Sequence, residues 1–258
     1  MKVLELFNLE GKVSVVTGAG SGLGTAFAQA MAEAGAKVVC ADINGDTAGK
    51  VAEDLNDKGY DAISLKADVS KEEEVKEMIN KTVKEWNTLD IIFNNAGVAG
   101  EVKPIHELSL AEWEKLMAIN MTGVFLCTKE AIKVMLEHKK GKIVNIASVW
   151  GLVGGNIIPV PAYTAAKGGV VNFTREAAVE YGPFGINVNA IAPGFFKSNL
   201  SGGMVEDPRF VDTIRENTLL HGLGQPDDLK GAALFLASSA SDFVTGQILV
   251  VDDGYLAK

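Results

Sequence analysis

The stretch Val13-Ser-Val-Val-Thr-Gly-Ala-Gly-Ser-Gly-Leu-Gly24 decides the fold of this chain. Its first five residues form a β-branched run typical of a buried parallel strand, and an Ala- and Met-rich segment to Ala34 follows the glycines. We therefore predict a strand, a glycine turn and a helix. Glycine permits close backbone approach, and a helix N-terminus favours a pyrophosphate. An ordinary glycine turn is the alternative, because the spacing reads T-G-x-x-x-G-x-G rather than G-x-G-x-x-G.

A second strand is predicted at residues 37–43, and Asp42 stands near its end. Dinucleotide-binding folds carry an acidic residue here, about 20 positions after the glycines, that accepts hydrogen bonds from the adenosine ribose. A solvated aspartate is the alternative. At about 4 Å and an effective dielectric of about 20, a carboxylate repels a 2′-phosphate by roughly 4 kcal/mol per charge pair. Ser21 in the glycine loop offers no positive charge to offset this repulsion, so NAD is predicted in preference to NADP.

Strands and helices alternate along the whole chain. This alternation predicts an α/β fold, with a doubly wound, mostly parallel sheet and helices on both faces. No shift in composition marks a second domain, so residues 1–258 are expected to form one dinucleotide-binding and catalytic domain. An irregular segment with apolar side chains at about 195–224 is interpreted as a substrate lid. The remaining predicted strands are 62–67, 89–93, 142–147, 186–192 and 247–251, and the remaining predicted helices include 46–58, 161–181 and 226–239.

Two helix starts carry the capping-box pattern, Ser70 with Glu73 and Ser109 with Glu112. The helix after the second box is predicted to run to about position 138, with Asn120 near its middle. Because Asn is unfavourable inside a helix, Asn120 is interpreted either as a side chain bonded to the helix backbone or as a buried hydrogen-bonding node.

Composition excludes several classes of protein. A net charge of −9 argues against binding to nucleic acid. The sequence shows neither a signal peptide nor a membrane span, so a cytoplasmic location without a membrane partner is expected. Cysteines and histidines lack metal-ligand spacing, and no metal site is predicted. These residues are Cys40, Cys127, His106, His138 and His221.

A second informative stretch runs from Ser148 to Lys167. The strand predicted before it delivers Ser148 to a strand end, and a Gly- and Pro-rich loop leads to Tyr163. In a helix, Tyr163 and Lys167 project from one face, so a hydroxyl, a phenol and an ammonium would converge. Taken alone, such a pair is more often a half-buried ring beside a solvated amine. The functional interpretation is favoured because these groups, the glycine loop and Asp42 all lie at the carboxyl ends of strands, where open parallel sheets bind ligands.

From Leu9 to Gly254 the chain resembles the short-chain dehydrogenase/reductase family, in its branch of compact single-domain members. The resemblance implies a Rossmann-type sheet of seven strands that binds NAD(P), a small-molecule alcohol or ketone as substrate, and a homo-oligomer, usually a tetramer or a dimer. It rests on the motifs Thr17-Gly18-x-x-x-Gly22-x-Gly24, Asp68-Val69, Asn94-Asn95-Ala96-Gly97, Asn120, Ser148, Tyr163-x-x-x-Lys167 and Pro193-Gly194.

The resemblance also implies a set of site residues. The catalytic residues would be Asn120, Ser148, Tyr163 and Lys167. The cofactor-binding residues would be Gly18, Ser21, Gly22, Leu23, Gly24, Asp42, Ile43, Asp68, Val69, Asn95, Ala96, Gly97, Tyr163, Lys167, Pro193, Gly194 and Ser198. Within that set, Asp68 and Val69 would line the adenine pocket, and Ser198 would bond the nicotinamide carboxamide.

The expected chemistry is hydride transfer between a secondary alcohol and its ketone. Tyr163 would be the general base in oxidation and the general acid in reduction. A free phenol titrates near 10, so its pKa must fall by about 2–3 units. An ammonium at about 4 Å supplies roughly that effect at a dielectric of about 20, and this role is assigned to Lys167. By the resemblance, Ser148 would orient the reacting oxygen and Asn120 would anchor a water that links Lys167 to solvent.

The substrate is the least defined feature of the sequence. The run Pro193-Gly194-Phe195-Phe196-Lys197-Ser198 is similar to that of gluconate 5-dehydrogenase-like members, which indicates a polyol, sugar or sugar acid. Near the C-terminus, Asp252-Asp253-Gly254 departs from the Asp-Gly-Gly common in the family. The candidate pocket residues are Glu101, Lys103, Trp150, Asn156, Phe195, Lys197 and the lid through His221. Their mixed character suits either a polyol or a hydrophobic alcohol.

Two alternatives are kept. The first is an NADPH-dependent reductase of 3-oxoacyl groups on acyl carrier protein, against which Asp42 and the acidic balance both count. The second is a non-catalytic dinucleotide-binding sensor, which would not require the four catalytic positions to be filled.

Overall fold

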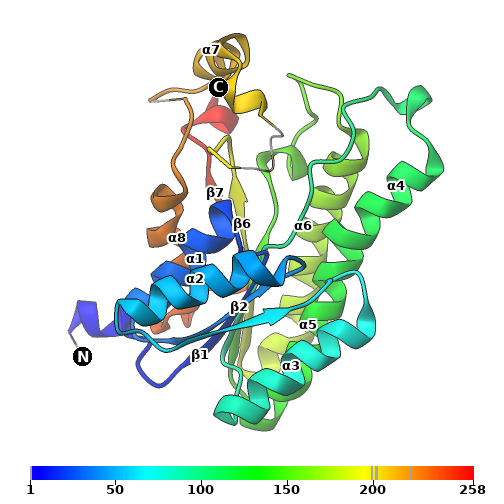
Figure 1. The fold of residues 1–258 in the computed structure, drawn as a ribbon. Helices are drawn as coiled ribbons and strands as arrows, with labels where there is room; N and C mark the ends of the chain where they lie inside the picture. Colours follow the sequence, from blue (N-terminus) through cyan, green and yellow to red (C-terminus); the bar gives the residue numbers. More distant parts are fainter. Residues whose placement is uncertain (1, 199, 201–202, 221) are drawn as a thin grey trace.

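The computed structural model describes residues 2–198, 200, 203–220 and 222–258. In this part of the chain seven parallel strands form one sheet in the order β3-β2-β1-β4-β5-β6-β7 (Figure 1). This arrangement confirms the predicted Rossmann-type α/β fold. The strands are β1 (Val13–Thr17), β2 (Lys37–Asp42), β3 (Ala62–Lys66), β4 (Ile91–Asn94), β5 (Gly141–Ile146), β6 (Ile186–Pro193) and β7 (Ile248–Val251).

Helices cover both faces of the sheet (Figure 1). On one face lie α1, α2 and α8, and on the other lie α3, α5 and α6. Neighbouring residues of β1 show the alternation, because Val15 packs toward the second group and Val16 toward the first. The α-helices are α1 (Gly22–Glu33), α2 (Gly45–Asp57), α3 (Glu72–Trp86), α4 (Leu110–Met117), α5 (Gly123–His138), α6 (Pro161–Tyr181), α7 (Pro208–Asn217) and α8 (Lys230–Ala237).

The strand register brings the carboxyl ends of the strands to one edge. Thr17 at the end of β1 pairs with Ala41 of β2, and Asn94 at the end of β4 pairs with Asn145 of β5. The order of the strands reverses at β1, which has β2 on one side and β4 on the other. Open sheets bind ligands at such a reversal, outside the carboxyl ends of the strands.

The helix around Asn120 differs from the prediction of one continuous helix. The chain forms α4, then a π-helical turn at Ala118–Thr122, then α5. The predicted capping box at Ser109 and Glu112 is confirmed. The box at Ser70 and Glu73 is wrong: α3 begins at Glu72 with Lys71 as its N-cap, because the Ser70 hydroxyl donates to Asp68 Oδ1 instead, at 2.7 Å.

The segment predicted as irregular, 195–224, contains a helix. Asp207 caps α7 by accepting a hydrogen bond of 2.9 Å from the backbone N–H of Arg209, and Pro208 is the first helical residue. An Asp-Pro pair at a helix start was a readable signal that the prediction missed. Pro226 also begins a 3₁₀ turn, Pro226–Leu229, rather than α8 itself. Among the described residues, no helix is long and apolar enough to cross a membrane.

Candidate active site

The loop between β1 and α1 is shaped by glycines that have no room for a side chain. Gly18 and Gly22 have φ values of +66° and +56°, in the left-handed region that favours glycine. A Cβ on Gly24 would lie 2.0 Å from the carbonyl oxygen of Gly18, and one on Gly22 would lie 3.2 Å from Ser198 Cβ. The backbone thus forms an open cradle at the N-terminus of α1, which fits a dinucleotide pyrophosphate.

The turn after β4 is locked onto this cradle. Asn95 Nδ2 donates to the carbonyl oxygen of Thr17 at 2.8 Å. The Thr17 hydroxyl accepts from the backbone N–H groups of Asn95 and Ala96 at 3.0 and 3.1 Å. A Cβ on Gly18 would meet Ala96 Cα at 2.9 Å, so the two loops are in direct contact. Their relative position is therefore fixed by both packing and hydrogen bonds.

Asp42 lies beside the glycine cradle, where the adenosine ribose is predicted to bind. Its Oδ2 accepts a 3.0 Å hydrogen bond from the N–H of Gly20, and its Oδ1 accepts a 2.9 Å bond from the N–H of Asn44. A carboxylate has about four acceptor positions, so capacity remains for a ribose hydroxyl. Beside it, the side chain of Ile43 is 62% exposed, so it offers an apolar surface to a ligand.

The turn after β3 forms a second wall of the cavity, where the adenine is predicted to bind. Asp68 Oδ1 accepts from both the N–H and the hydroxyl of Ser70, and its own N–H donates to Glu74 Oε2 at 2.9 Å. Val69 packs against Gly123, where an added Cβ would lie 2.8 Å from Val69 Cγ2. The start of α5 therefore holds Val69 in place.

Asn120 is a buried hydrogen-bonding node, as one of the two interpretations of the sequence proposed. Its Oδ1 accepts from the N–H of Val98 at 2.9 Å, and its Nδ2 donates to the carbonyl oxygen of Val98 at 2.8 Å. The side chain is fully buried, at 0% exposure. The π-helical turn thus fixes the backbone of the irregular segment that follows the Asn95 turn. The water link assigned to Asn120 stays a prediction.

Ser148, Tyr163 and Lys167 converge as predicted from their spacing. Ser148 stands just beyond β5, where its Oγ accepts from the N–H of Trp150 at 3.1 Å. Tyr163 and Lys167 lie on the first turns of α6, and Lys167 Nζ is 5.7 Å from the centre of the Tyr163 ring. Nζ also donates a 2.6 Å hydrogen bond to the carbonyl oxygen of Ile146.

Burial changes the ionisation of both groups. Burial lowers the pKa of Lys167 from 10.5 to about 8. Burial raises the pKa of Tyr163, and a hydrogen bond with the Ser148 hydroxyl lowers it by less. In the protein alone the larger effect on the Tyr163 pKa therefore opposes the lowering expected from Lys167, and that lowering stays a prediction.

A single cavity of about 860 Å³ connects these elements. All of the predicted cofactor residues line it, together with Ser148, whereas Asn120 lies behind its wall. Glu101, Trp150 and Phe195 also line it, as predicted. Several further lining residues lie in the segment 195–224 that is predicted as a lid: Leu200, Val205, Phe210, Ile214 and Leu223. The sequence analysis did not single out Val98, Val102, Ile119, Ile146, Ile158 and Val160.

Three predicted pocket residues are wrong. Lys103 forms an ion pair with Glu112 instead. Asn156 accepts a hydrogen bond from the Tyr255 hydroxyl outside this cavity. Lys197 is exposed, and its N–H pairs with Gly224. In each case a local partner or the solvent takes the polar side chain away from the cavity. The predicted pocket residue His221 lies outside the described residues.

The two cysteines are buried core residues. Burial raises the pKa of both thiols, Cys40 and Cys127, to about 12. A thiol with so high a pKa carries little thiolate at neutral pH and is a poor nucleophile or metal ligand. In the described part of the chain, no three His, Cys, Asp or Glu side chains cluster closely enough to hold a metal ion.

Known proteins are similar to this chain in sequence and in fold. A family model described as enoyl-(acyl carrier protein) reductase matches residues 18–256. Cis-4-hydroxycyclohexanecarboxylate dehydrogenase of Sinomonas cyclohexanicum is 42% identical over 246 residues, 95% of this chain and 97% of that protein. 2-Dehydro-3-deoxy-D-gluconate 5-dehydrogenase of Escherichia coli (strain K12) is 38% identical over 257 residues, 99% and 100% of the two chains. The solved structure of a gluconate 5-dehydrogenase from Burkholderia cenocepacia J2315, in complex with NADP and tartrate, matches with a TM-score of 0.94 at 35% identity over 100% of both chains.

Proposed function

The chain belongs to the short-chain dehydrogenase/reductase family of oxidoreductases, and we propose that it transfers a hydride between NAD(H) and a secondary alcohol or its ketone. One observation carries this proposal. Ser148, Tyr163 and Lys167 lie on the wall of the same cavity as the glycine cradle. A proton-transferring phenol therefore faces the space that a cradled dinucleotide would share with a substrate.

The residues present fit a nicotinamide dinucleotide. Its pyrophosphate would lie on the cradle formed by Gly18, Gly22 and Gly24, and Asp42 would hold its adenosine ribose. Pro193, Gly194 and Ser198 would lie beside its nicotinamide. When bound, this group accepts or donates the hydride. The side chains of the protein supply the proton transfer and orient the substrate.

Tyr163 moves the proton in this proposal. Its hydroxyl oxygen takes the proton of the substrate alcohol during oxidation and returns one to the ketone oxygen during reduction. Ser148 donates a hydrogen bond to the same substrate oxygen and orients it. The Lys167 ammonium favours the ionised phenol, with roughly 4 kcal/mol available at a separation of about 4 Å and a dielectric of about 20. Such an effect is large enough to oppose the pKa increase that burial causes.

The preference for NAD over NADP rests on Asp42. Its carboxylate already accepts the N–H of Gly20 in the loop, so a 2′-phosphate would meet a fixed negative charge. The solved relative from Burkholderia is in complex with NADP, so relatives of this fold accept the phosphorylated cofactor. A comparison of kcat/KM for NAD and NADP separates the two possibilities, and a strong preference for NADPH would instead support the 3-oxoacyl reductase.

The reaction is tested by following NADH formation with a panel of secondary alcohols, polyols and sugar acids. Tyr163→Phe should bind NADH normally yet lose turnover, because it keeps the ring and removes only the hydroxyl. Tyr60→Phe makes the same chemical change outside the cavity and should keep wild-type activity. Near wild-type turnover in Tyr163→Phe would contradict the mechanism and would favour a non-catalytic sensor. Two further expectations, a cytoplasmic location and a homo-oligomer by family analogy, belong to the same proposal.

A further inference from the structure

The part of the cavity around Ser148 and Tyr163 has a mainly apolar wall. Trp150 and Phe195 form the first side of it, with their ring centres 5.5 Å apart at near right angles. The Trp150 ring also meets the Tyr163 ring edge to face, at 6.4 Å. Ile158 and Val160 complete this side. Because these rings and branched side chains carry few polar atoms, a ligand here makes mainly apolar contacts.

A second part of the cavity wall, contributed by α7 and its flanks, is apolar too. Phe210 and Ile214, one turn apart on α7, line the cavity together with Val205 just before the helix and Leu223 after it. Ile214 is completely buried, at 0% exposure. Figure 1 shows α7 lying beyond the carboxyl ends of β6 and β7, over the edge of the sheet where the site lies. The helix therefore faces the substrate space with hydrophobic groups.

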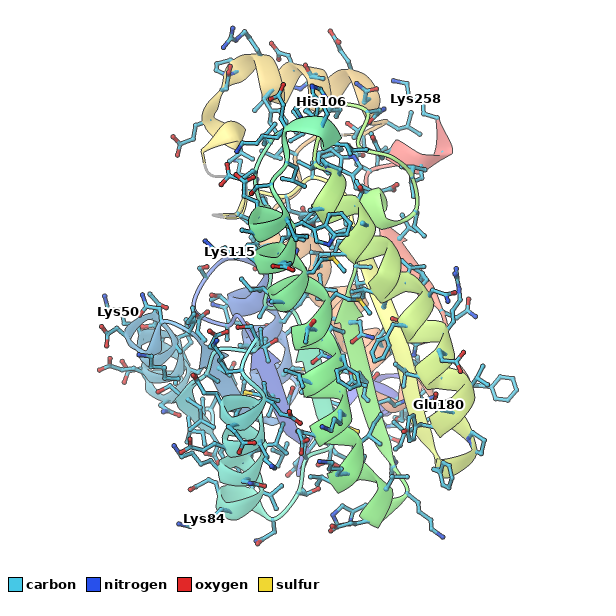
Figure 2. The ribbon with its side chains drawn as sticks, turned by 90° about the vertical axis from the view of Figure 1, so that its right-hand side faces the viewer. Lys50, Lys84, His106, Lys115, Glu180 and Lys258 are labelled. Carbon is cyan, nitrogen blue, oxygen red and sulfur yellow. The ribbon has the colours of Figure 1, made fainter. Side chains whose placement is uncertain are left out.

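Charge in this half of the cavity is negative. Among the wall residues that the structure describes, Glu101 is the one charged side chain outside the cofactor half, and it is exposed at the cavity wall. The nearby cation Lys103 is paired with Glu112, and its electrostatic interaction with Glu101 is weaker. Lys167 is committed to the carbonyl of Ile146 and to Tyr163. His106, five residues after Glu101 in the chain, lies at the same end of the molecule as Lys258 (Figure 2).

These features disfavour a carboxylate or a polyhydroxylated chain. A buried hydroxyl or carboxylate loses its water, and it needs a partner of matching chemistry to recover that cost. Within the described wall of the substrate half, the polar groups that meet a ligand are concentrated at Ser148 and Tyr163, where the reacting oxygen must sit. A carboxylate at the far end of the substrate would instead approach the like charge of Glu101.

We infer that the substrate is an uncharged secondary alcohol or ketone with an apolar carbon skeleton, and that Glu101 selects against carboxylates. The inference rests on the proposed hydride transfer and narrows its substrate class. It separates this chain from the relatives whose names specify a hydroxycyclohexanecarboxylate or a deoxygluconate. An apolar skeleton gains free energy by burial against Trp150, Phe195 and Phe210, whereas a sugar acid does not.

The experiment measures binding without turnover. Wild-type protein saturated with NADH is titrated with alcohols, which form dead-end complexes, and NADH fluorescence reports the Kd. The matched ligands are cis-4-hydroxycyclohexanecarboxylate, its methyl ester and 4-methylcyclohexanol, with gluconate as the sugar acid. We expect the ester and the methyl compound to bind at least about tenfold more tightly than the acid. Equal or tighter binding of the acid or of gluconate would overturn the inference.

Glu101→Gln tests the charge directly. The variant should raise the affinity for the acid by about threefold and leave that for the ester unchanged, because only the acid meets the like charge. Glu53→Gln on α2 makes the same change in net charge outside the cavity and should alter neither Kd. An unchanged acid-to-ester ratio in Glu101→Gln would overturn the role of Glu101.

Turnover separates this inference from the proposed function. Binding of the neutral alcohols without any NADH formation from NAD would contradict hydride transfer while supporting the apolar site. Oxidation that favours the acid over its ester would leave hydride transfer intact and would overturn the inferred substrate class. The two failures therefore give different results in the same set of ligands.

Discussion

Lys167 Nζ donates a 2.6 Å hydrogen bond to the backbone carbonyl of Ile146, the last residue of β5. This bond ties the first turns of α6 to β5, the strand that leads to Ser148. It also holds an ammonium in a buried position, because the side chain of Lys167 is only 4% exposed. Because burial disfavours the charged form, it lowers the pKa of Lys167 to about 8.

A pH-dependent stability follows from Lys167. Its pKa in the folded protein, about 8, lies below the unfolded value of 10.5. Below pH 8 both states bind the proton and the full burial penalty applies, whereas between pH 8 and 10.5 only the unfolded state keeps it, so stability rises with pH. Relative to Lys167→Met, the wild-type protein should gain roughly 3 kcal/mol across this window in urea unfolding. A difference between the two proteins that does not change with pH would contradict the lowered pKa.

Asp42→Ala should change cofactor selectivity. The substitution removes the repulsion of a 2′-phosphate and a ribose hydrogen bond, so the ratio of the Kd for NADPH to that for NADH should fall by at least about a hundredfold. Asp42→Asn keeps an acceptor for the N–H of Gly20 without the charge, and thus separates electrostatics from loop geometry. The two Kd values are measured by fluorescence titration at fixed ionic strength. A ratio unchanged in both variants would exclude Asp42 as the determinant of selectivity.

Gly24→Ala should disrupt the cradle. The new Cβ would lie 2.0 Å from the carbonyl oxygen of Gly18, so the loop must move. We expect a loss of roughly 1–3 kcal/mol in the free energy of unfolding and no measurable binding of NADH. Gly231→Ala on α8 is the matched control, since no atom beyond its chain neighbours and the adjacent helix backbone lies within 4 Å of its Cβ, and it should stabilise the protein by about 0.5–1 kcal/mol. Normal NADH binding by Gly24→Ala would show that the cradle does not hold the cofactor.

Asp253 supports the wall formed by α7 from the far end of the chain. It has a φ of +55°, and its carboxylate accepts backbone N–H bonds from Leu220, at 2.8 Å, and from Gly222. Asp253→Gly relieves the left-handed backbone but removes these bonds, so the melting temperature should change little while KM for the alcohol rises several-fold. Asn tolerates the same φ, so Asp253→Asn should have a KM for the alcohol between those of the wild-type protein and Asp253→Gly.

Limited proteolysis gives a second measurement for Asp253. Faster cleavage of the Asp253→Gly variant within residues 207–224, at an unchanged Kd for NADH, would locate the effect in the α7 segment. An unchanged KM together with wild-type proteolysis would show that the carboxylate does not support this wall.

Short sequence patterns predicted the strands and helix starts that depend on interactions between residues close in the chain. The β-branched runs gave the strands within one or two residues at most ends, because a strand buried on both faces needs a continuous apolar sequence. The Ser109 box gave the start of α4, since its bonds join residues three apart. The Ser70 box failed because Asp68, two residues earlier, competes for the same hydroxyl. Asp207 and Pro208 signal the start of α7, but the glycines in the same segment led to a prediction of irregular structure.

By itself the sequence determined the Rossmann-type fold, the glycine cradle and the convergence of Ser148, Tyr163 and Lys167. These features follow from spacing along single elements and from the rule that parallel strands end at one edge. Only the tertiary structure decided that Asn120 bonds to Val98, that burial lowers the pKa of Lys167, and that the cavity wall near Tyr163 is mainly apolar. Each of these features depends on which segments, distant in the chain, pack around a side chain and exclude water from it. The spacing of residues in the sequence does not reveal that packing.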